Sequence, residues 1–248
     1  MTDVLLINPN TTPSITDLVL KAAKRFAAKD TRLRAITGAF GPRYIASRVG
    51  YAIAGHAAVD ALANDRGRKD AVVLACFGDP GLLALKEVAK VPVVGMAEAS
   101  ILQACTMGER FSIVTGGERW RPMLEEFVAG RGLAGRLASI RTVAPSGADI
   151  ARDPKSAMAL LTKACSACVR EDNADVVILG GAGLAGLAAK LRSAVAAPLL
   201  DGVGCALSMA EGLARQKPIK AAAGALAMPA PVESVNLSKG LAKLIGSP

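Results

Sequence analysis

The sequence repeats itself in a way that leaves few folds open. Strand-like and helix-like segments alternate from residue 4 to residue 214, in two successive series of four strand–helix units. In the first series the expected strands cover 4–7, 32–36, 71–75 and 91–94, and the helices cover 14–28, 47–63, 81–88 and 97–105. In the second series the strands cover 111–114, 137–142, 176–179 and 198–200, and the helices cover 120–128, 154–170, 184–195 and 203–214. Such alternation predicts parallel sheets covered by helices, the α/β class.

The two series also match in sequence. Residues 70–78 align with residues 175–183, which places Cys76 opposite Gly181 in the alignment. Two such lobes would face each other across a cleft, to which the carboxyl ends of the strands contribute. A single (β/α)₈ barrel also contains eight such units, so the periodicity alone leaves both architectures open.

We expect the chain to cross between the lobes twice. The first lobe is expected to contain residues 1–98 together with 207–248, and the second lobe residues 99–206. The tail from residue 217 is rich in proline and then shows the pattern of a short amphipathic helix over 232–245. We expect this tail to pack on the first lobe.

Composition and charge exclude several classes of function. No apolar run is long enough to span a bilayer, and the amino terminus lacks the pattern of a signal peptide. The five cysteines are scattered and odd in number, which favours a reducing, cytoplasmic location. The formal charge is +9, but the basic residues are dispersed and not interleaved with aromatic ones, so we expect no nucleic-acid partner. A diffuse positive field instead favours a small anionic substrate.

Cys76 lies where a buried strand ends. The apolar run 71–75 predicts the strand, and we expect Asp79 to act as N-cap and Pro80 as the first residue of the next helix. A helix N-terminus beside the thiol would lower its pKa and let it act as a base near neutral pH. Position alone favours this interpretation no more than a small apolar core residue, which is how free cysteine commonly behaves.

Six short motifs occur in order along the chain: Asn-Pro-Asn-Thr at 8–11, Gly-Pro-Arg-Tyr-Ile-Ala-Ser-Arg at 41–48, Cys-Phe-Gly-Asp-Pro-Gly at 76–81, Gly-Met-Ala-Glu-Ala-Ser at 95–100, Phe-Ser-Ile-Val-Thr at 111–115 and Ile-Leu-Gly-Gly-Ala-Gly at 178–183. Together they resemble the Asp/Glu/hydantoin racemase superfamily, and the hydantoin and allantoin racemases most closely. The resemblance extends through about residue 213. It implies two pseudo-symmetric parallel-sheet α/β lobes rather than a barrel. It also implies proton transfer without a cofactor or metal, at an activated carbon of a small hydantoin-, allantoin- or carboxylate-type substrate held between the lobes. A homo-oligomer is compatible with this interpretation.

The resemblance also assigns roles to individual residues. Cys76 matches the first catalytic cysteine of the family. The second belongs at Gly181, where family members typically read Gly-Cys-Ala-Gly, so this chain departs from the pattern at a central position. Asn10 and Thr115 match positions that bind polar groups of the substrate, and backbone N–H groups beside Cys76 and Gly181 could stabilise an enolate-like intermediate. The positions expected to contact substrate are Asn10, Thr11, Phe77, Gly78, Thr115, Gly116, Ala182 and Gly183.

The glycine at 181 leaves other functions open. A site with one thiol fits decarboxylation followed by protonation, as in the related arylmalonate decarboxylases, and it also fits a catalytically reduced homologue that only binds ligands. A third alternative comes from a different class. Residues 181–186 match the G-x-G-x-x-G fingerprint with Asp201 downstream, which predicts an NAD-binding oxidoreductase. The repeat explains the same glycines, because Gly183 and Gly186 correspond to Gly78 and Gly81.

Overall fold

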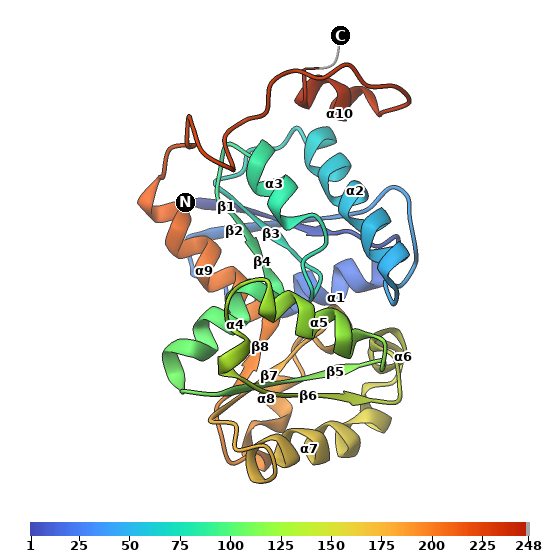
Figure 1. Cartoon of the computed structure of the whole chain (residues 1–248), viewed down its shortest axis with the longest axis vertical. Coiled ribbons are helices and arrows are strands. Elements are labelled where there is room, and N and C mark those ends of the chain that lie inside the picture. The colour runs from blue at the N-terminus through green and yellow to red at the C-terminus, as the bar shows by residue number, and fades with distance from the viewer. Residues whose placement is uncertain (247–248) are drawn as a thin grey trace.

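The computed structural model describes residues 1–246 and shows two α/β lobes stacked one above the other (Figure 1). Each lobe contains its own four-stranded parallel sheet, with strand orders β2-β1-β3-β4 and β6-β5-β7-β8. The two orders are equivalent, position by position, in the two halves of the chain. The predicted two-lobed architecture is therefore confirmed, and the barrel is excluded because the sheets are separate.

The elements of the first lobe are β1 (Thr2–Asn8), α1 (Pro13–Ala23), β2 (Thr31–Thr37), α2 (Arg48–Asn64), β3 (Ala71–Leu74), α3 (Leu82–Val88) and β4 (Val93–Gly95). Those of the second are β5 (Phe111–Gly116), α5 (Trp120–Ala129), β6 (Leu137–Val143), α6 (Gly147–Arg152), α7 (Pro154–Arg170), β7 (Val176–Leu179), α8 (Ala188–Leu191) and β8 (Leu199–Asp201). Short 3₁₀ turns η1 (Ala134–Arg136), η2 (Ala182–Leu184) and η3 (Arg192–Ala194) complete the second lobe.

The central strands are buried along their whole length because helices cover both faces of each sheet. Every residue of β1, β3, β5 and β7 is buried, whereas the edge strands β2 and β6 are largely half-buried. This is the expected pattern for parallel sheets, whose inner strands read as continuous hydrophobic runs. Equivalent registers, Val4 with Ala71 and Phe111 with Val176, bring the carboxyl ends of the central strands to one edge in each lobe.

Two helices are exchanged between the lobes. Helix α4 (Met96–Met107) follows β4 of the first sheet but packs against β5 and β7 of the second. Helix α9 (Gly202–Gln216) follows β8 of the second sheet but packs against β1, β3 and β4 of the first. The two helices also pack on each other, so they join the lobes through a shared apolar core. We propose that the lobes divide within these helices, at 98/99 and 206/207.

One predicted helix, over 184–195, is interrupted. It consists of η2, α8 and η3, because Gly186 has a φ of 81° and its N–H donates to the Asp201 carboxylate at 2.7 Å. The same carboxylate caps α9 by accepting from Val203 and Gly204. The glycine-rich segment therefore does not open a helix, as a dinucleotide fingerprint requires, and Asp201 is already occupied.

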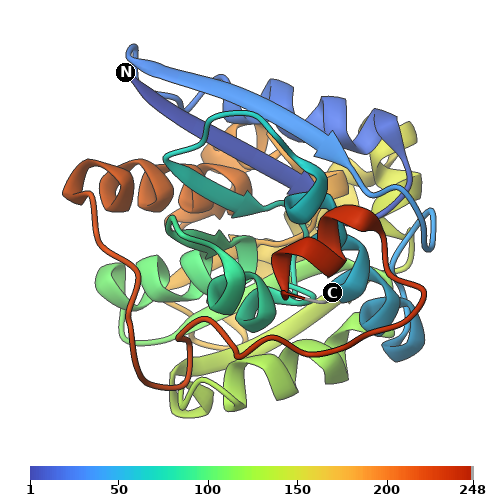
Figure 2. The same ribbon diagram turned by 90° about the horizontal axis from the view of Figure 1, so that it is seen from above.

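The tail crosses the outside of the first lobe (Figure 2). Its helix α10 (Lys239–Leu244) is shorter than predicted and packs on α2, with Asn64 donating to Ser238 at 3.0 Å. Residues 247–248 of the predicted first lobe lie outside the described residues. None of the helices in residues 1–246 has the length and apolar character needed to cross a membrane.

Candidate active site

A pocket lies between the two lobes, at the carboxyl ends of their central strands. Its volume is about 460 Å³, including the part that opens to solvent. Seven sequence-predicted positions line it: Asn10, Cys76, Phe77, Thr115, Gly181, Ala182 and Gly183. The first three come from the first lobe and the other four from the second. The fold thus brings together, from both halves of the repeat, most of the positions that the sequence suggested.

Cys76 and Gly181 reach this pocket by equivalent routes. Cys76 lies two residues beyond Leu74, the end of β3, and Gly181 lies two residues beyond Leu179, the end of β7. The strand ends touch, because the Phe77 ring lies against Gly180, where a Cβ atom would come within 2.5 Å of it. The pairing found in the sequence alignment is therefore also a proximity in space.

The Cys76 thiol is a poor acid in its present surroundings. The residue is only 7% exposed, and burial, with a smaller contribution from the charge of Asp79, raises the thiol pKa. The predicted lowering of this pKa is wrong. Helix α3 begins at Leu82, six residues further along the chain, so Cys76 is not at the N-terminus of this helix.

Asp79 is a helix cap, but of a different helix from the one predicted. Its backbone is left-handed, with a φ of 55°, and its carboxylate accepts from the N–H groups of Ala97 at 2.9 Å and Glu98 at 2.8 Å. The prediction that it caps α3, with Pro80 as first helical residue, is wrong, since the turn points the carboxylate at the start of α4 instead. Burial raises the pKa of Asp79 to about 7, and the two backbone donors act in the opposite direction.

Gly181 has a backbone conformation that other residues avoid. Its φ is 133°, and a Cβ atom there would lie 3.1 Å from Leu184 Cδ1 and 3.6 Å from Thr115 Oγ1. A side chain at 181 would thus point toward Thr115, in the pocket, but only at the cost of backbone strain. Glycine is therefore the residue that this turn accommodates without backbone strain.

The side chain of Asn10 is oriented by its neighbour. Asn8 donates to Asn10 Oδ1 at 2.9 Å, and the N–H of Thr12 donates to the same oxygen at 2.9 Å. The amide oxygen is therefore engaged, which identifies it as the acceptor and leaves the NH₂ group without a partner in residues 1–246. Asn10 thus offers a hydrogen-bond donor at the pocket wall without adding charge.

Further donors remain free on both lobes. Within residues 1–246, no hydrogen bond uses the Thr115 hydroxyl. The backbone N–H groups without an acceptor there include those of Phe77, Gly78, Ala182 and Gly183. Unpaired N–H groups beside a reacting carbonyl are what an oxyanion needs. Donors without an acceptor therefore belong to three residues of the pocket lining, Phe77, Ala182 and Gly183.

Three predicted contact residues lie outside the pocket wall. Thr11 lines a neighbouring groove. Gly78 lies behind the wall, where a Cβ atom would come within 2.6 Å of the Trp120 ring. Gly116 packs against the loop before α6, where a Cβ atom on this residue would lie 2.7 Å from Pro145 O. At Gly78 and Gly116 the absence of a side chain permits close packing around the site. We propose no direct contact with substrate for Thr11, Gly78 or Gly116.

Six lining residues were not predicted, and they come from segments that the sequence does not bring together: Ile15, Tyr44, Ile45, Trp120, Gly147 and Leu184. Tyr44 belongs to the loop after β2, yet its hydroxyl accepts from the N–H of Gly147 in the second lobe at 3.0 Å. Burial raises the pKa of Tyr44, so the hydroxyl stays neutral. Tyr44 therefore joins the two lobes across the pocket. The only indication of this role in the sequence is that Tyr44 belongs to the motif at 41–48.

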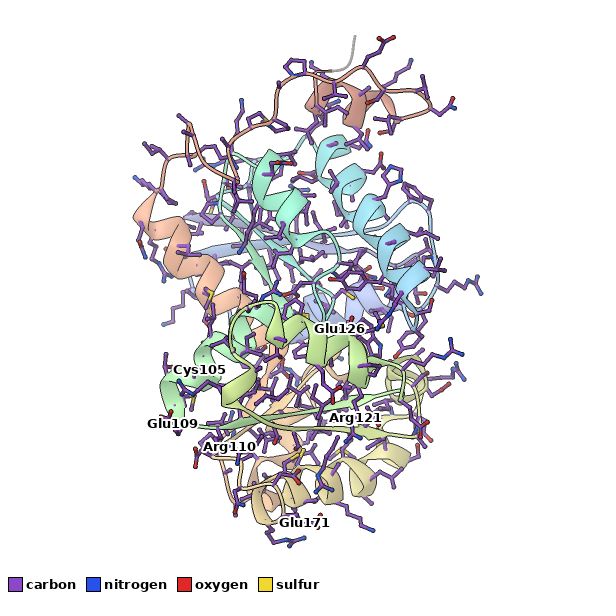
Figure 3. The ribbon with its side chains drawn as sticks, viewed as in Figure 1. Cys105, Glu109, Arg110, Arg121, Glu126 and Glu171 are labelled. Carbon is purple, nitrogen blue, oxygen red and sulfur yellow. The ribbon has the colours of Figure 1, made fainter. Side chains whose placement is uncertain are left out.

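The remaining cysteines lie elsewhere. Cys105 is on α4 (Figure 3), Cys165 and Cys168 are buried in α7, and Cys205 is buried in α9. No group of three or more histidine, cysteine or acidic side chains in the described part of the chain is arranged to hold a metal ion.

Known proteins resemble this chain in both sequence and structure. The sequence model of the family described as Asp/Glu/hydantoin racemase matches residues 4–210. A hydantoin racemase from a Pseudomonas species is 37% identical over 209 residues, 84% of each chain, and one from Paenarthrobacter aurescens is 37% identical over 212 residues, 85% of this chain and 90% of that one. The crystal structure of an allantoin racemase from Pseudomonas fluorescens superposes with a TM-score of 0.91 at 31% identity, covering 95% of this chain and all of the other.

Proposed function

This chain belongs to the Asp/Glu/hydantoin racemase family and is a racemase-type enzyme, and we propose that it transfers a proton at the ring α-carbon of a substituted hydantoin or a related cyclic ureide. The hydantoin racemases that it resembles support this substrate class. The neutral polar donors of the pocket, Asn10 and Thr115, suit the amide and carbonyl groups of such a ring.

In the proposed reaction the Cys76 sulfur exchanges a proton with the substrate carbon. As a base, the thiolate takes the proton from carbon, and the electron pair moves into the neighbouring carbonyl to give an enolate. The free N–H groups of Phe77, Ala182 and Gly183 support this step, because donors held in place for a developing oxyanion lower its energy. The thiol then returns the proton, and the carbonyl re-forms. Because burial raises the pKa of Cys76, the thiol must first lose its proton to water, and the thiolate so formed is a strong base toward a weak carbon acid.

The second wall carries no thiol. Gly181 supplies no proton donor, so a proton delivered to that face must come from water or another acid. We therefore propose a site that works mainly from one side. It exchanges the proton readily on the face of Cys76 and inverts the carbon more slowly. A site of this kind would also serve a decarboxylation followed by protonation.

One observation carries the proposal: Cys76 and Gly181, equivalent residues of the two lobes, line one pocket together with Asn10 and Thr115. The experiment is to follow the optical rotation of a single-enantiomer hydantoin with wild type and with Cys76→Ala. Cys105→Ala, which removes a half-buried thiol from α4 outside the pocket, is the matched control. Loss of rotation change in Cys76→Ala alone supports the proposal, whereas equal rates in all three proteins contradict it. Release of carbon dioxide from an arylmalonate, tested in parallel, would favour the decarboxylase alternative.

A further inference from the structure

A groove leads out of the pocket between the two lobes. It consists of two adjoining depressions with volumes of about 550 and 1490 Å³, which share Leu18, Lys21 and Ala151. The smaller depression meets the pocket at Gly183, and the larger one meets it at Ile15 and Tyr44. We call it the basic groove, because its charged lining is dominated by Lys21, Arg25, Arg43, Arg152 and Lys190.

The positive charge of the basic groove is poorly compensated. Of the 21 acidic residues in the chain, only Asp17 lines it. Arg152 has an exposed partner in Asp149 at 3.4 Å. Lys21, Arg43 and Lys190 take part in none of the ion pairs formed within residues 1–246.

The Arg25 side chain packs against the turn that contains Gly183 and Gly186. Its Nη1 atom lies 3.3 Å from the place of a Cβ atom on Gly186, so the guanidinium rests on the backbone of that turn. The charge of Arg25 acts on Asp201, which already accepts three backbone N–H groups. Arg25 is therefore held against this turn, whereas Lys21, four residues earlier on α1, is exposed.

The position of Lys21 relative to the pocket sets the length of ligand that could reach it. Ile15, on the pocket wall, and Lys21 are six residues apart on α1, which is a rise of about 9 Å. Ile15 and Lys21 both line the larger depression, which therefore connects the pocket wall with the Lys21 ammonium. A substituent that is attached to a ring in the pocket and follows this depression would approach this charge.

We propose that the basic groove is a subsite for an anionic substituent, and that the preferred substrates carry a carboxylate at the end of a short arm on the reacting carbon. This inference rests on the proposed function for the position of the ring. The ring would lie against the apolar wall formed by Ile15, Ile45 and Trp120, while the arm follows the groove to Lys21 and Arg43. Unpaired cations beside a substrate path attract and hold an anion, and salt weakens both effects.

The hydantoins of glutamate and glutamine provide a matched pair of probes, because they differ only in a carboxylate against an amide. We expect wild type to favour the glutamate hydantoin in kcat/KM by about five-fold at low salt, in line with exposed charge pairs. The double variant Lys21→Met/Arg43→Met should reduce this preference to about two-fold or less and leave the rate with the glutamine hydantoin unchanged. The control is Lys24→Met, a charge change on an exposed lysine that follows α1 but does not line the groove.

Calorimetric titration of the same two compounds separates this inference from the proposed function. If neither hydantoin is turned over, the proposed function fails, and the inference still holds only if the glutamate compound binds more tightly and Lys21→Met/Arg43→Met removes the difference. If wild type turns over both compounds with equal kcat/KM, or if the double variant turns them over with an undiminished carboxylate preference, the inference is overturned and the proposed function stands. If neither compound is turned over and wild type binds both equally well, the proposed function and the inference both fail. An equal loss of preference in Lys24→Met would also overturn it, because the effect would then reflect overall charge.

Discussion

Cys76 and Gly181 lie at the same point of the two repeats, each two residues beyond the buried strand that ends at Leu74 or Leu179, and both line one pocket between the lobes. The backbones of the two lobes are thus equivalent at this point, but only the first lobe carries a thiol there. The proposed chemistry follows from this difference between the two lobes.

A side chain at position 181 should destabilise the folded protein. We expect Gly181→Ala to lower the free energy of unfolding by about 1–3 kcal/mol, because a φ of 133° strains any other residue. Gly181→Cys should cost a similar amount but place a sulfur near Thr115. Urea denaturation measures the stability, and comparison of the two variants separates strain from thiol chemistry. Both variants being as stable as wild type would show that the backbone is not constrained as described.

Asp79 should make stability depend on pH. Its pKa is about 7 in the folded protein and about 3.8 in the unfolded chain, so the folded state binds more protons between these values. Its contribution to stability is therefore fully present below about pH 4 and is lost as the pH rises through about 7. Urea denaturation between pH 4 and pH 8 should show this fall in wild type, and a much smaller slope in Asp79→Asn. An equal slope in both proteins would assign the pH dependence to other groups.

Tyr44 should hold the two lobes in register over the pocket. Tyr44→Phe removes the acceptor for the N–H of Gly147, and we expect a loss of about 1 kcal/mol in unfolding free energy and a raised KM with little change in kcat. Tyr51→Phe is a useful comparison, since the Tyr51 hydroxyl donates to Gly78 O within its own lobe at 2.8 Å. Steady-state kinetics with both variants test this. A drop in kcat alone for Tyr44→Phe would instead point to a part in the chemical step.

Thr115 should bind the substrate through its hydroxyl. Thr115→Val keeps the shape of the buried side chain but removes the hydroxyl, and we expect kcat/KM to fall by about ten-fold, the effect of one lost hydrogen bond. Thr106→Val is the control, because the Thr106 hydroxyl donates to Gln103 O in α4 and does not line the pocket. Unchanged kinetics in Thr115→Val would remove this residue from the site.

The sequence was a good guide wherever local pattern and burial agree. Helix α7 and strand β7 have the predicted bounds, since the strand is a continuous apolar run and the helix begins at Pro154 after the capping Asp153. The repeat placed Cys76 and Gly181 together because equivalent strand ends of two facing sheets meet.

Long-range partners explain what the sequence missed. The spacing of Asp79 predicts a cap for the helix that follows it, whereas the left-handed turn directs its carboxylate to α4. The pKa of Cys76 depends on burial and on where α3 begins, neither of which the residue pattern specifies. Tyr44 and Trp120 meet at the pocket from different lobes, and no spacing along the chain records that meeting.

The central claim is that sulfur reaches the substrate carbon from one lobe only, and deuterium exchange tests it most directly. Each enantiomer of a hydantoin substrate is incubated separately in D₂O with wild type and with Cys76→Ala, and exchange at the carbon and inversion are followed together by NMR and chiral chromatography. We predict that wild type exchanges the hydrogen of one enantiomer faster than it inverts the carbon, and that Cys76→Ala abolishes this exchange. Exchange that always accompanies inversion at equal rates from both enantiomers, or exchange that survives in Cys76→Ala, would contradict the account.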